Sequence, residues 1–541
     1  MNAASPDPRL LWNKVPLAAV VLYFLFAALL GLPGPGMNND EAVFFDGAAH
    51  MANSSQEPSF AHDPWSWVTI AGRRWQLMVL PYAGALRSYL ALIPFTLFGS
   101  NYYTARIVTM LVGAFALWGF SVLVRTQVDA ATAGITSLIL AVHPAYLTQT
   151  IYDQGGVAEW MAPFGILSIA LARYCKRPAA GRAFWVGVAI GFGGWSRANI
   201  AWLVGSAALA GVIVLRKRMW VGWRYLTWMA AGAITGGAPL LWYEIRSRGA
   251  TFHFMGATNN PQPFLQLVAH RLALLGQTFL SDSEHRGMWD GPALPLWQTI
   301  LFSAVVVVSL FYCLAGRWKP GEERGPFCRV AGLTFIFLLT CMLTSQLNIS
   351  DHHLIALIPI AAVLTAIAAS DSWRRWPRLR LAAVAIALLY LGIALQWNLM
   401  AARKIRSTGG VRLWSNSIDS ISTYLQRAHP GAVIKVTDWG FQHSLFVISN
   451  SRIVSNELFW GATVERSGSG KLWRDEISPE DIYVIHSTGL IQFPEAAEGF
   501  ARGLAASARP FRITKFQEKG GTAYAEVVEI AKAGPAPSSN E

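Results

Sequence analysis

The sequence is poor in charged residues and in cysteine, and it lacks a cleavage site after its first apolar run. Only 14% of its 541 residues are charged, against roughly 25% in soluble domains, which argues against a soluble chain. The apolar run 17–32 is followed by Pro-Gly-Pro-Gly rather than small residues, so we expect a retained helix, not a cleaved signal peptide. The cysteines lack metal-ligand spacing, and no disulfide framework is indicated; they are Cys175, Cys313, Cys328 and Cys341.

What is abundant is apolar sequence. Hydrophobic residues make up 53% of the chain, and there are 23 tryptophans, a residue that concentrates at membrane–water interfaces. In a soluble protein the net charge of +13 would suggest a nucleic-acid partner. Here the basic residues cluster between apolar runs, where they orient helices in a membrane. The composition therefore predicts a polytopic α-helical membrane protein that binds membrane lipids and no nucleic acid.

The apolar runs give an expected number of membrane crossings. The run 79–98 carries Pro81, Arg87 and Pro94, so we expect a re-entrant or surface-lying helix there that does not cross. With the short glycine-rich run 183–195 counted as a span, the total is about eleven. The other runs are long enough to cross about 30 Å of hydrocarbon and lie near 16–32, 104–124, 130–149, 157–173, 198–215, 225–243, 293–315, 328–347, 351–370 and 381–398.

Basic clusters between the apolar runs set the expected orientation. Like Arg9 and Lys14, the clusters should face the cytoplasm; they lie at 173–182, 216–224, 317–329 and 374–380. The large first loop at 33–103 and the segment beyond residue 400 then face outward. We expect a multi-pass membrane protein with a cytoplasmic N-terminus and an extracytoplasmic C-terminal domain.

The chain changes character near residue 400. Alternating polar and apolar residues at 432–436 and 482–485 predict short strands. The segment 418–427 predicts an amphipathic helix. We therefore expect a transmembrane domain at 1–399, a small extracytoplasmic α/β domain at 400–532 and a disordered Pro/Ser-rich tail at 533–541.

Two adjacent carboxylates, Asp40 and Glu41, follow the first apolar run and its Pro-Gly exit. At a membrane surface such a pair is solvated, ion-paired, metal-bound or engaged with a substrate. The ordinary alternative is a helix start, because Asn39 or Asp40 can cap a helix. Many other polar residues fall on the same predicted outer face, where charge near a membrane suggests function; they are Asp46, Arg73, Arg74, Arg106, Asp153, Glu159, Arg197, Arg271, Asp282, Glu284, His285, Arg286, Asp351, His352 and His353.

Several short motifs follow one another along the first part of the chain. Asp40-Glu41 comes after the first span, and Leu97-Phe98-Gly99-Ser100-Asn101 with Arg106 follows some way on. Asp153 is a second outer acid, and Trp195-Ser196-Arg197 follows it. This order resembles the clan C (GT-C) glycosyltransferases, in particular the family 39 branch of protein O-mannosyltransferases and aminoarabinose-type lipid A transferases. The resemblance covers about residues 15–215, and 349–364 resembles the family's late helix.

The resemblance implies a GT-C-like fold and a role for each of these residues. Asp40 would be the catalytic base or an acid that orients the acceptor, with Glu41 as its partner, and Asp153 would frame the acceptor or a divalent metal. The donor phosphate would contact Arg197, Arg106, Arg74 and Arg73, and the acceptor-side or accessory residues would be His352, His353 and Glu159.

One segment departs from the family pattern. Met78–Tyr82 lacks the Lys that relatives carry before their prolines. The basic residues available to replace it are Arg73, Arg74 and Arg87.

Each of these residues also has an ordinary structural explanation. Arg106 would support packing or a helix cap, Asp153 would lie in a plain turn, and Glu159 would compensate a helix N-terminus. The pair His352 and His353 would cap a helix at the interface. In a polar loop, solvation is the simpler expectation for Glu284 and His285.

The function implied by the resemblance is transfer of a sugar from a polyprenyl phosphate to an acceptor hydroxyl or phosphate on the outer face of the membrane. A single displacement would invert the anomeric centre, and the acceptor would be a lipid, a glycan or a protein. A lipid or glycolipid transporter or flippase is the alternative, although no inverted repeat with paired broken helices is evident. A non-catalytic membrane scaffold whose C-terminal domain binds a partner is the third hypothesis.

Overall fold

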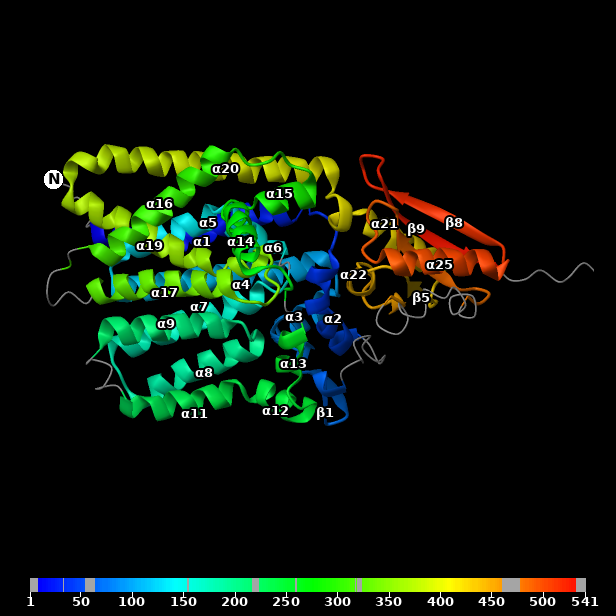
Figure 1. The fold of residues 1–541 in the computed structure, drawn as a ribbon, viewed down its shortest axis with the longest axis horizontal. Helices are drawn as coiled ribbons and strands as arrows, with labels where there is room; N and C mark the ends of the chain where they lie inside the picture. Colours follow the sequence, from blue (N-terminus) through cyan, green and yellow to red (C-terminus); the bar gives the residue numbers. More distant parts are fainter. Residues whose placement is uncertain are drawn as a thin grey trace, which may run out of the picture.

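A bundle of apolar helices makes up one part of the molecule, and a small sheet domain extends it along the long axis (Figure 1). The start of α1 and the sheet domain lie at opposite ends of the bundle (Figure 1). The computed structural model describes residues 8–32, 34–53, 64–152, 155–216, 223–257, 260–316, 318, 324–459 and 477–531.

The bundle helices are mostly apolar, and a helix satisfies its own backbone hydrogen bonds, as a lipid environment requires. Among the described residues, six helical segments are long and apolar enough to cross a membrane, or seven if the bent pair α5 and α6 is one span. The helices of the bundle are α1 (Pro8–Gly31), α4 (Tyr102–Gln127), α5 (Ala130–Val142), α6 (Pro144–Tyr152), α7 (Ala158–Lys176), α8 (Ala180–Ser196), α9 (Ile200–Leu215), α11 (Leu226–Gly236), α12 (Ala238–Ser247), α16 (Leu296–Ala315), α17 (Arg324–Thr344), α19 (Leu357–Arg375) and α20 (Arg380–Thr408).

The expected count of about eleven crossings is not confirmed, because several apolar runs are broken or short. The run 130–149 breaks at His143, since Pro144 disfavours a helical residue before it, and α5 and α6 meet at 63°. The run 225–243 is divided at Gly237 into α11 and α12. The shorter helices α8, α9 and α11 still lie along the long helices (Figure 1).

The segment between α1 and α4 folds into short elements near the sheet domain. The helix α3 has 13 residues, about 20 Å at 1.5 Å per residue, which is shorter than the hydrocarbon core. The prediction that 79–98 does not cross agrees with this length. The elements of the segment are α2 (Asn39–Asn53), η1 (Pro64–Ser66), a hairpin of β1 (Trp67–Ile70) and β2 (Arg73–Gln76), a hairpin of β3 (Met78–Leu80) and β4 (Ala83–Gly84), and α3 (Leu86–Phe98).

Other short elements connect the bundle helices. The turns η2 and η3 belong to connections at the end away from the sheet domain. The short helices α13, α14 and α15 lie instead toward α2 and α6 (Figure 1), and α18 packs against α14. Their bounds are η2 (Trp223–Tyr225), α13 (Ala250–Ala257), α14 (Phe264–Thr278), α15 (Asp282–Trp289), α18 (Asp351–Leu354) and η3 (Pro377–Leu379).

The sheet domain has five strands in the order β6-β5-β7-β9-β8. The strand β5 pairs in parallel with β6 and β7, whereas β9 is antiparallel to β7 and β8. The predicted strands at 432–436 and 482–485 and the predicted helix at 418–427 are confirmed. The elements are η4 (Arg412–Trp414), α21 (Ser417–Ala428), β5 (Val433–Val436), α22 (Gln442–Ile448), β6 (Val454–Glu457), β7 (Ile482–His486), α25 (Pro494–Ser507), β8 (Phe511–Gln517) and β9 (Ala523–Ile530).

The helix α20 connects the two parts of the molecule. It continues unbroken to Thr408, so the boundary expected between residues 399 and 400 falls inside it. Gly409 ends the helix with φ 70°, a left-handed conformation that suits glycine. The expected tail at 533–541 lies outside the described residues.

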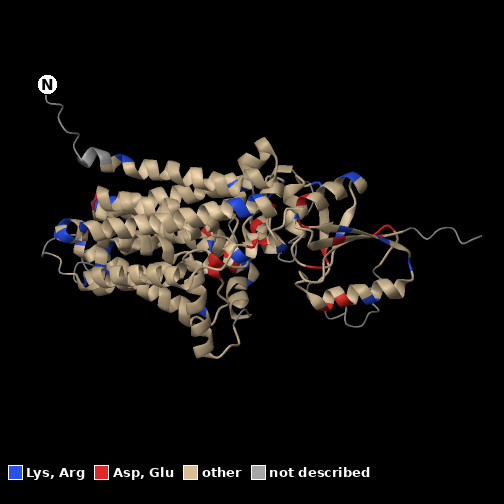
Figure 2. Ribbon diagram, turned by 90° about the horizontal axis from the view of Figure 1, so that it is seen from above, with Lys and Arg blue, Asp and Glu red and all other residues tan. Residues whose placement is uncertain are grey.

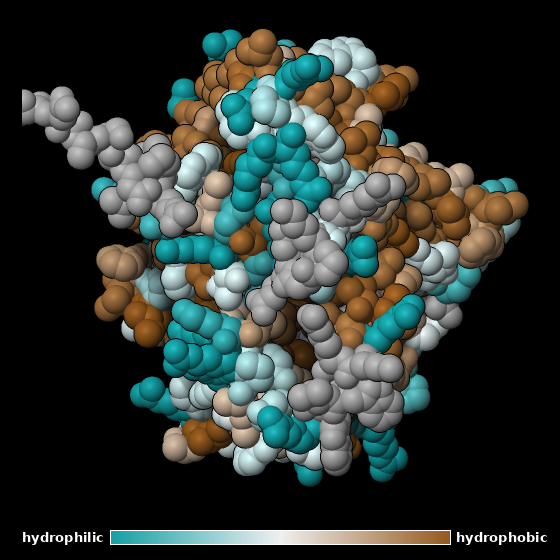
Figure 3. Space-filling model, turned by 90° about the vertical axis from the view of Figure 1, so that its left-hand side faces the viewer, coloured by the Kyte–Doolittle hydropathy of each residue, from teal (hydrophilic) through white to brown (hydrophobic). Residues whose placement is uncertain are grey.

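Charged side chains are unevenly distributed over the molecule. Lys and Arg mark the end of the bundle away from the sheet domain, whereas acidic residues gather where the bundle meets that domain (Figure 2). Seen end-on, the first of these ends carries hydrophilic side chains with hydrophobic ones around them (Figure 3). A polar end face with apolar sides is what a membrane-crossing bundle requires.

Candidate active site

A cavity of about 310 Å³ lies among the short elements near the sheet domain. Its wall combines α2, the β3–β4 turn, Gly155, the start of α9, α13 and the segment before and within α18. Its polar side chains include Asp40, Asn199, His352 and His353. Apolar side chains line much of the rest, among them the aromatic Phe44, Tyr82, Trp202 and Phe254. A largely apolar wall with a few convergent polar groups is the usual form of a ligand site.

Asp40 is the acid of this cavity. The side chain of Asn38 accepts the backbone N–H of Asp40 at 2.8 Å, so Asn38 caps α2 and the Asp40 carboxylate is not needed as a cap. No ion pair or hydrogen bond joins this carboxylate to another described residue. Burial raises the pKa of Asp40, against the lowering effect of His352 and Arg197. The group therefore has the surroundings of a general base.

The neighbouring acid, Glu41, points into the protein instead. Its two carboxylate oxygens accept hydrogen bonds from Nε and Nη2 of Arg106 at 2.8 and 2.9 Å, and both side chains are fully buried. Arg106 also donates to the carbonyls of Pro35 and Gly36. Successive residues of a helix point about 100° apart, which allows the two adjacent acids to have different surroundings. The Glu41–Arg106 pair fixes the start of α2.

A second buried ion pair supports the same helix. Nη2 and Nε of Arg87 donate to Glu159 at 2.6 and 3.2 Å, and both side chains are fully buried. Nη1 of Arg87 lies 3.4 Å from the carbonyl oxygen of Glu41. Removing one member of such a pair costs roughly 3–5 kcal/mol, because the other charge is left buried. The charge of Arg87 within the apolar run 79–98 is thus neutralised by Glu159.

Two glycines allow the basic residues to approach the cavity. Gly155 and Gly156 have φ of 63° and 82°. A Cβ on Gly155 would overlap the ring of His352, and one on Gly156 would lie 2.5 Å from Nη1 of Arg197. Nη1 of Arg197 donates to the carbonyl oxygens of both glycines, at 2.7 Å for Gly156. Only glycine fits both the backbone conformation and the space at these positions.

His353 and Arg197 bring two donors side by side at the cavity wall. Nδ1 of His353 accepts the backbone N–H of Ser350 at 3.1 Å, so the ring proton is on Nε2. That nitrogen lies 3.3 Å from Nη2 of Arg197. An anionic oxygen within reach of both nitrogens could accept a hydrogen bond from each, as a phosphate does from an arginine.

The sheet domain packs against the other side of α2. Asn39 Oδ1 accepts the backbone N–H of His443 at 3.2 Å. The Asp46 carboxylate lies 3.6 Å from Nδ1 of His443 and 3.5 Å from Nε2 of His50, and His50 stacks on Phe446. Burial alone would lower the pKa of His443, but Asp46 raises it. The helix that carries Asp40 is therefore held from both sides.

The structure brings some of the predicted site residues together and separates others. Asp40, His352 and His353 line the cavity, and Arg197 lies directly behind its wall. Glu41, Arg106 and Glu159 are engaged in the buried pairs. Exposed positions on β2 are occupied by Arg73 and Arg74. Asp153 lies outside the described residues, although Gly155 lines the cavity.

The expectation of a solvated loop for Glu284 and His285 is wrong. Both lie on α15 and are 2% and 1% exposed. Trp397 of α20 packs on the His285 ring with a centroid distance of 4.6 Å. The sequence around them is polar, and only the packing of α15 between α6, α18 and α20 buries it.

Several lining residues were not singled out from the sequence. The aromatic wall of Tyr82, Trp202 and Phe254 comes from three distant segments, and Tyr82 stacks on Phe254 at 5.1 Å. The glycine pair Gly155-Gly156 leaves room for the close approach of His352 and Arg197.

No group of three or more His, Cys, Asp or Glu side chains in the described part of the chain is arranged to hold a metal ion. A metal at Asp40 would need ligands from beyond these residues, and Asp153 is the acid expected there.

The fold is that of the GT-C glycosyltransferases, and the expected architecture is confirmed: a polytopic helical bundle with a C-terminal α/β domain. The apo form of ArnT from Cupriavidus metallidurans superposes with a TM-score of 0.64 at 16% identity, over 98% of this chain and 100% of that one. ArnT bound to undecaprenyl phosphate gives a TM-score of 0.60 at 14% identity, over 96% and 98%.

A second solved protein shares the fold over less of its length. The Archaeoglobus fulgidus oligosaccharyltransferase tethered with an acceptor peptide gives a TM-score of 0.50 at 13% identity, over 94% of this chain and 74% of that one. Its complex with Zn and sulfate gives 0.50 at 12% identity, over 94% and 72%. The sequence itself matches no family model and no curated protein.

Proposed function

We propose that the protein is a membrane glycosyltransferase that moves a sugar from a polyprenyl phosphate to an acceptor on the outer face of the membrane. The observation that carries this proposal is the cavity in which Asp40 lies with His352 and His353, backed by Arg197. One end of the reaction needs a base and the other needs donors for a phosphate. That ArnT with the same fold was solved with undecaprenyl phosphate supports the lipid donor.

In this mechanism Asp40 takes the proton of the acceptor hydroxyl as its oxygen attacks the anomeric carbon. The bond between that carbon and the phosphate oxygen breaks, and the polyprenyl phosphate leaves with the electron pair. A single displacement of this kind inverts the anomeric centre. The leaving phosphate lies at His352 and His353, and Arg197 adds its positive charge from behind the wall. A well-placed donor contributes roughly 3 kcal/mol to such a step.

The remaining predicted residues receive different roles. Glu41, Arg106 and Glu159 hold α2 and its surroundings and do not contact phosphate. Asp153 frames the acceptor hydroxyl opposite Asp40, or holds a divalent metal with it. A chelator that abolishes turnover, with recovery on adding Mg²⁺ or Mn²⁺, would support the metal; full activity in the chelator would exclude it.

We also propose an orientation. The basic clusters at 216–224 and 374–380 put the end that carries α1 in the cytoplasm. The cavity and the sheet domain then face the periplasm of a bacterial cell, where the acceptor is a lipid, a glycan or a protein.

The experiment is to compare the glycolipids and glycans of cells that contain the wild-type protein, the Asp40→Asn variant or neither, by mass spectrometry. We expect one class of envelope molecule to lose its sugar without the protein and with Asp40→Asn, at equal membrane levels of the variant. A transporter or scaffold would tolerate this isosteric change. Unchanged glycosylation with the inserted variant would contradict the proposal.

A further inference from the structure

A row of side chains leads from the cavity into the protein behind His352. Nδ1 of His352 lies 3.6 Å from Oδ1 of Asp351, an ion-pair distance that is longer than a hydrogen bond. The other oxygen of Asp351 lies 2.8 Å from the hydroxyl of Ser283, and the same hydroxyl lies 2.9 Å from Oε2 of Glu284. These residues come from α18 and α15, two short helices outside the long bundle helices. The proposed mechanism assigns no role to Ser283, Glu284 or Asp351.

The number of hydrogens in this row is limited. A serine hydroxyl has one hydrogen to donate, yet two carboxyl oxygens lie at hydrogen-bond distance from Ser283. If both acids were ionised, one of these contacts would join two oxygens without a hydrogen between them. The geometry therefore requires one additional proton on Glu284 or Asp351.

The surroundings put that proton on Glu284. Asp351 has His352 beside it and also accepts the backbone N–H of His352 at 2.8 Å. Glu284 is 2% exposed and forms no ion pair with any described residue. Its other contacts are neutral, from the Ser281 hydroxyl at 2.9 Å and the amide of Gln149. Burial and the neighbouring charge of Asp351 raise the pKa of Glu284 to about 7.

We propose that Glu284 is a positioning residue for the transfer reaction: its protonated carboxyl holds Ser283 and Asp351, and Asp351 holds the His352 ring at the phosphate end of the cavity. This inference rests on the proposed function. When Glu284 ionises, Ser283 can donate its single hydroxyl hydrogen to only one of two negatively charged carboxylates, that of Glu284 or that of Asp351. The contact between α15 and α18 then weakens, and His352 loses its fixed orientation.

Other charged and titratable groups face this row. They are Asp40 on α2, Arg197 after α8, Arg271 on α14, His353 on α18, and Asp282, His285 and Arg286 on α15 itself, with Asp282 and Arg286 paired at 2.8 Å. Arginine stays charged across the accessible pH range. Asp40 must be ionised to act as base, so its titration affects the acid side of the activity profile. His352 and His353 could also lose a proton as pH rises, so only the part of the alkaline decline that moves in a Glu284 variant is assigned to Glu284.

The test is the pH profile of kcat/KM for the full chain and its Glu284→Gln variant, with a polyprenyl-phosphate sugar as donor. The amide keeps the group neutral and can donate to Ser283 at every pH. We expect wild-type activity to fall above about pH 7. The variant should keep at least a third of the neutral-pH activity, with its alkaline decline at least one pH unit higher. Glu284→Ala should lose activity at all pH values.

Two results would overturn the inference. One is a Glu284→Gln protein that is active with an unchanged alkaline decline, and the other is a folded variant that is inactive at every pH. The protein loses the stability that a carboxyl with a raised folded-state pKa contributes as pH rises through that pKa. The unfolding temperature of Glu284→Gln, relative to that of the wild type, should therefore rise from pH 5 to about pH 7 and stay level at higher pH. This measurement needs no turnover, so it separates failure of the proton assignment from failure of the proposed function.

Discussion

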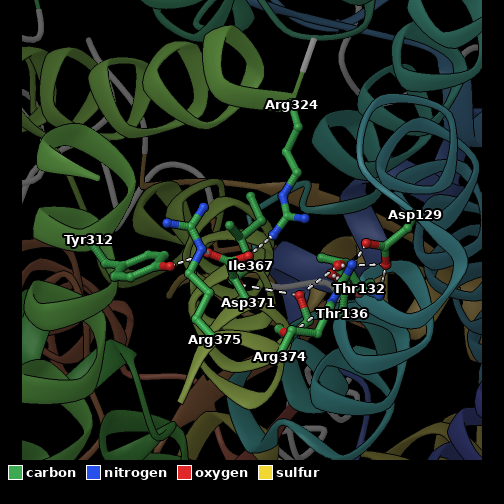
Figure 4. A network of polar contacts seen from close by, with 10 residues as sticks. Asp129, Thr132, Thr136, Tyr312, Arg324, Ile367, Asp371, Arg374 and Arg375 are labelled. Carbon is green, nitrogen blue, oxygen red and sulfur yellow. Dashed lines mark hydrogen bonds and ion pairs between the residues drawn. The ribbon is translucent and has the colours of Figure 1, made fainter. Parts of the chain in front are cut away.

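The two ends of the helix bundle each carry a cluster of charged residues, and the clusters differ in what they leave accessible. At the end that holds the start of α1, Asp371 accepts from Tyr312, Arg324 and Arg375, and Arg374 pairs with Asp129 at 2.5 Å (Figure 4). At the other end, two fully buried pairs surround α2, and Asp40 beside them faces a cavity. The first cluster joins helices through ion pairs, whereas the second leaves the Asp40 carboxylate facing the cavity.

Solvent access separates the clusters further. The side chains of Arg374 and Arg375 are 45% and 36% exposed, so water screens part of their charge. Arg87, Arg106, Glu41 and Glu159 have no exposed surface. Ion pairs near water are worth little, but breaking a buried pair is costly. The cluster around α2 should therefore be much more sensitive to substitution.

The largest difference concerns activity. We expect Asp40→Asn to lower kcat by about 10²–10⁴-fold, the usual contribution of a general base, while donor binding is largely kept. The matched control is Asp371→Asn at the opposite end, which should keep activity within about threefold of wild type once equal amounts of folded protein are compared. Turnover of a polyprenyl-phosphate sugar by the purified proteins measures both. Equal losses in the two variants would remove the distinction between the clusters.

Next comes the stability of the cluster around α2. Arg106→Ala should lower the free energy of unfolding by about 3–5 kcal/mol, because Glu41 is left buried without its partner. Thermal unfolding in detergent measures the loss. The double variant Glu41→Gln with Arg106→Gln should recover part of it, since no lone charge remains. A loss below about 1 kcal/mol in the single variant would show that water reaches this pair.

A smaller loss is expected at the other cluster. Asp371→Asn keeps the shape of the side chain but removes the charge that Arg324 and Arg375 approach. Arg375 is 36% exposed and can turn toward water, whereas Arg324 is 17% exposed. We expect a loss of about 1.5–3 kcal/mol, the range for hydrogen bonds to a charged group. The same unfolding experiment applies. A loss equal to that of Arg106→Ala would contradict the difference in solvent access.

The smallest effect should follow substitution of Arg73. This residue is exposed on β2 and faces Ile70 in the hairpin register, outside the cavity. Arg73→Ala should change stability by no more than about 0.5 kcal/mol, as is usual for exposed sites, and should leave KM for the donor within about twofold. A tenfold rise in that KM would mean that Arg73 binds the donor phosphate after all.

Much of the architecture could be predicted because it depends on local patterns. The short α3, the strands β5 and β7, and the helix α21 follow from length, alternation and amphipathic spacing within a few residues of one another. Asp40 could be selected because an acid directly after a membrane span is chemically conspicuous.

The partners of the charged residues could not be predicted. Glu41 and Asp40 look equivalent in sequence. No local pattern shows that Arg106, far along the chain, forms an ion pair with Glu41 and not with Asp40. Glu284 and His285 read as polar loop residues because their burial depends on α6, α18 and α20. Side-chain pairing across distant elements is set by the packed bundle rather than by any local pattern.

The packing of α22 on α2 also limits how the protein can change in evolution. One face of α2 supplies Asp40 to the cavity, while Asn39, Asp46 and His50 of the same helix meet the sheet domain. A sheet domain taken from a relative would have to bring a matching counterpart of His443 and Phe446, or Asp40 would shift with its helix. The helix bundle and the sheet domain are therefore expected to change together in evolution. Changes in acceptor preference should arise in loops away from the contact between α2 and α22.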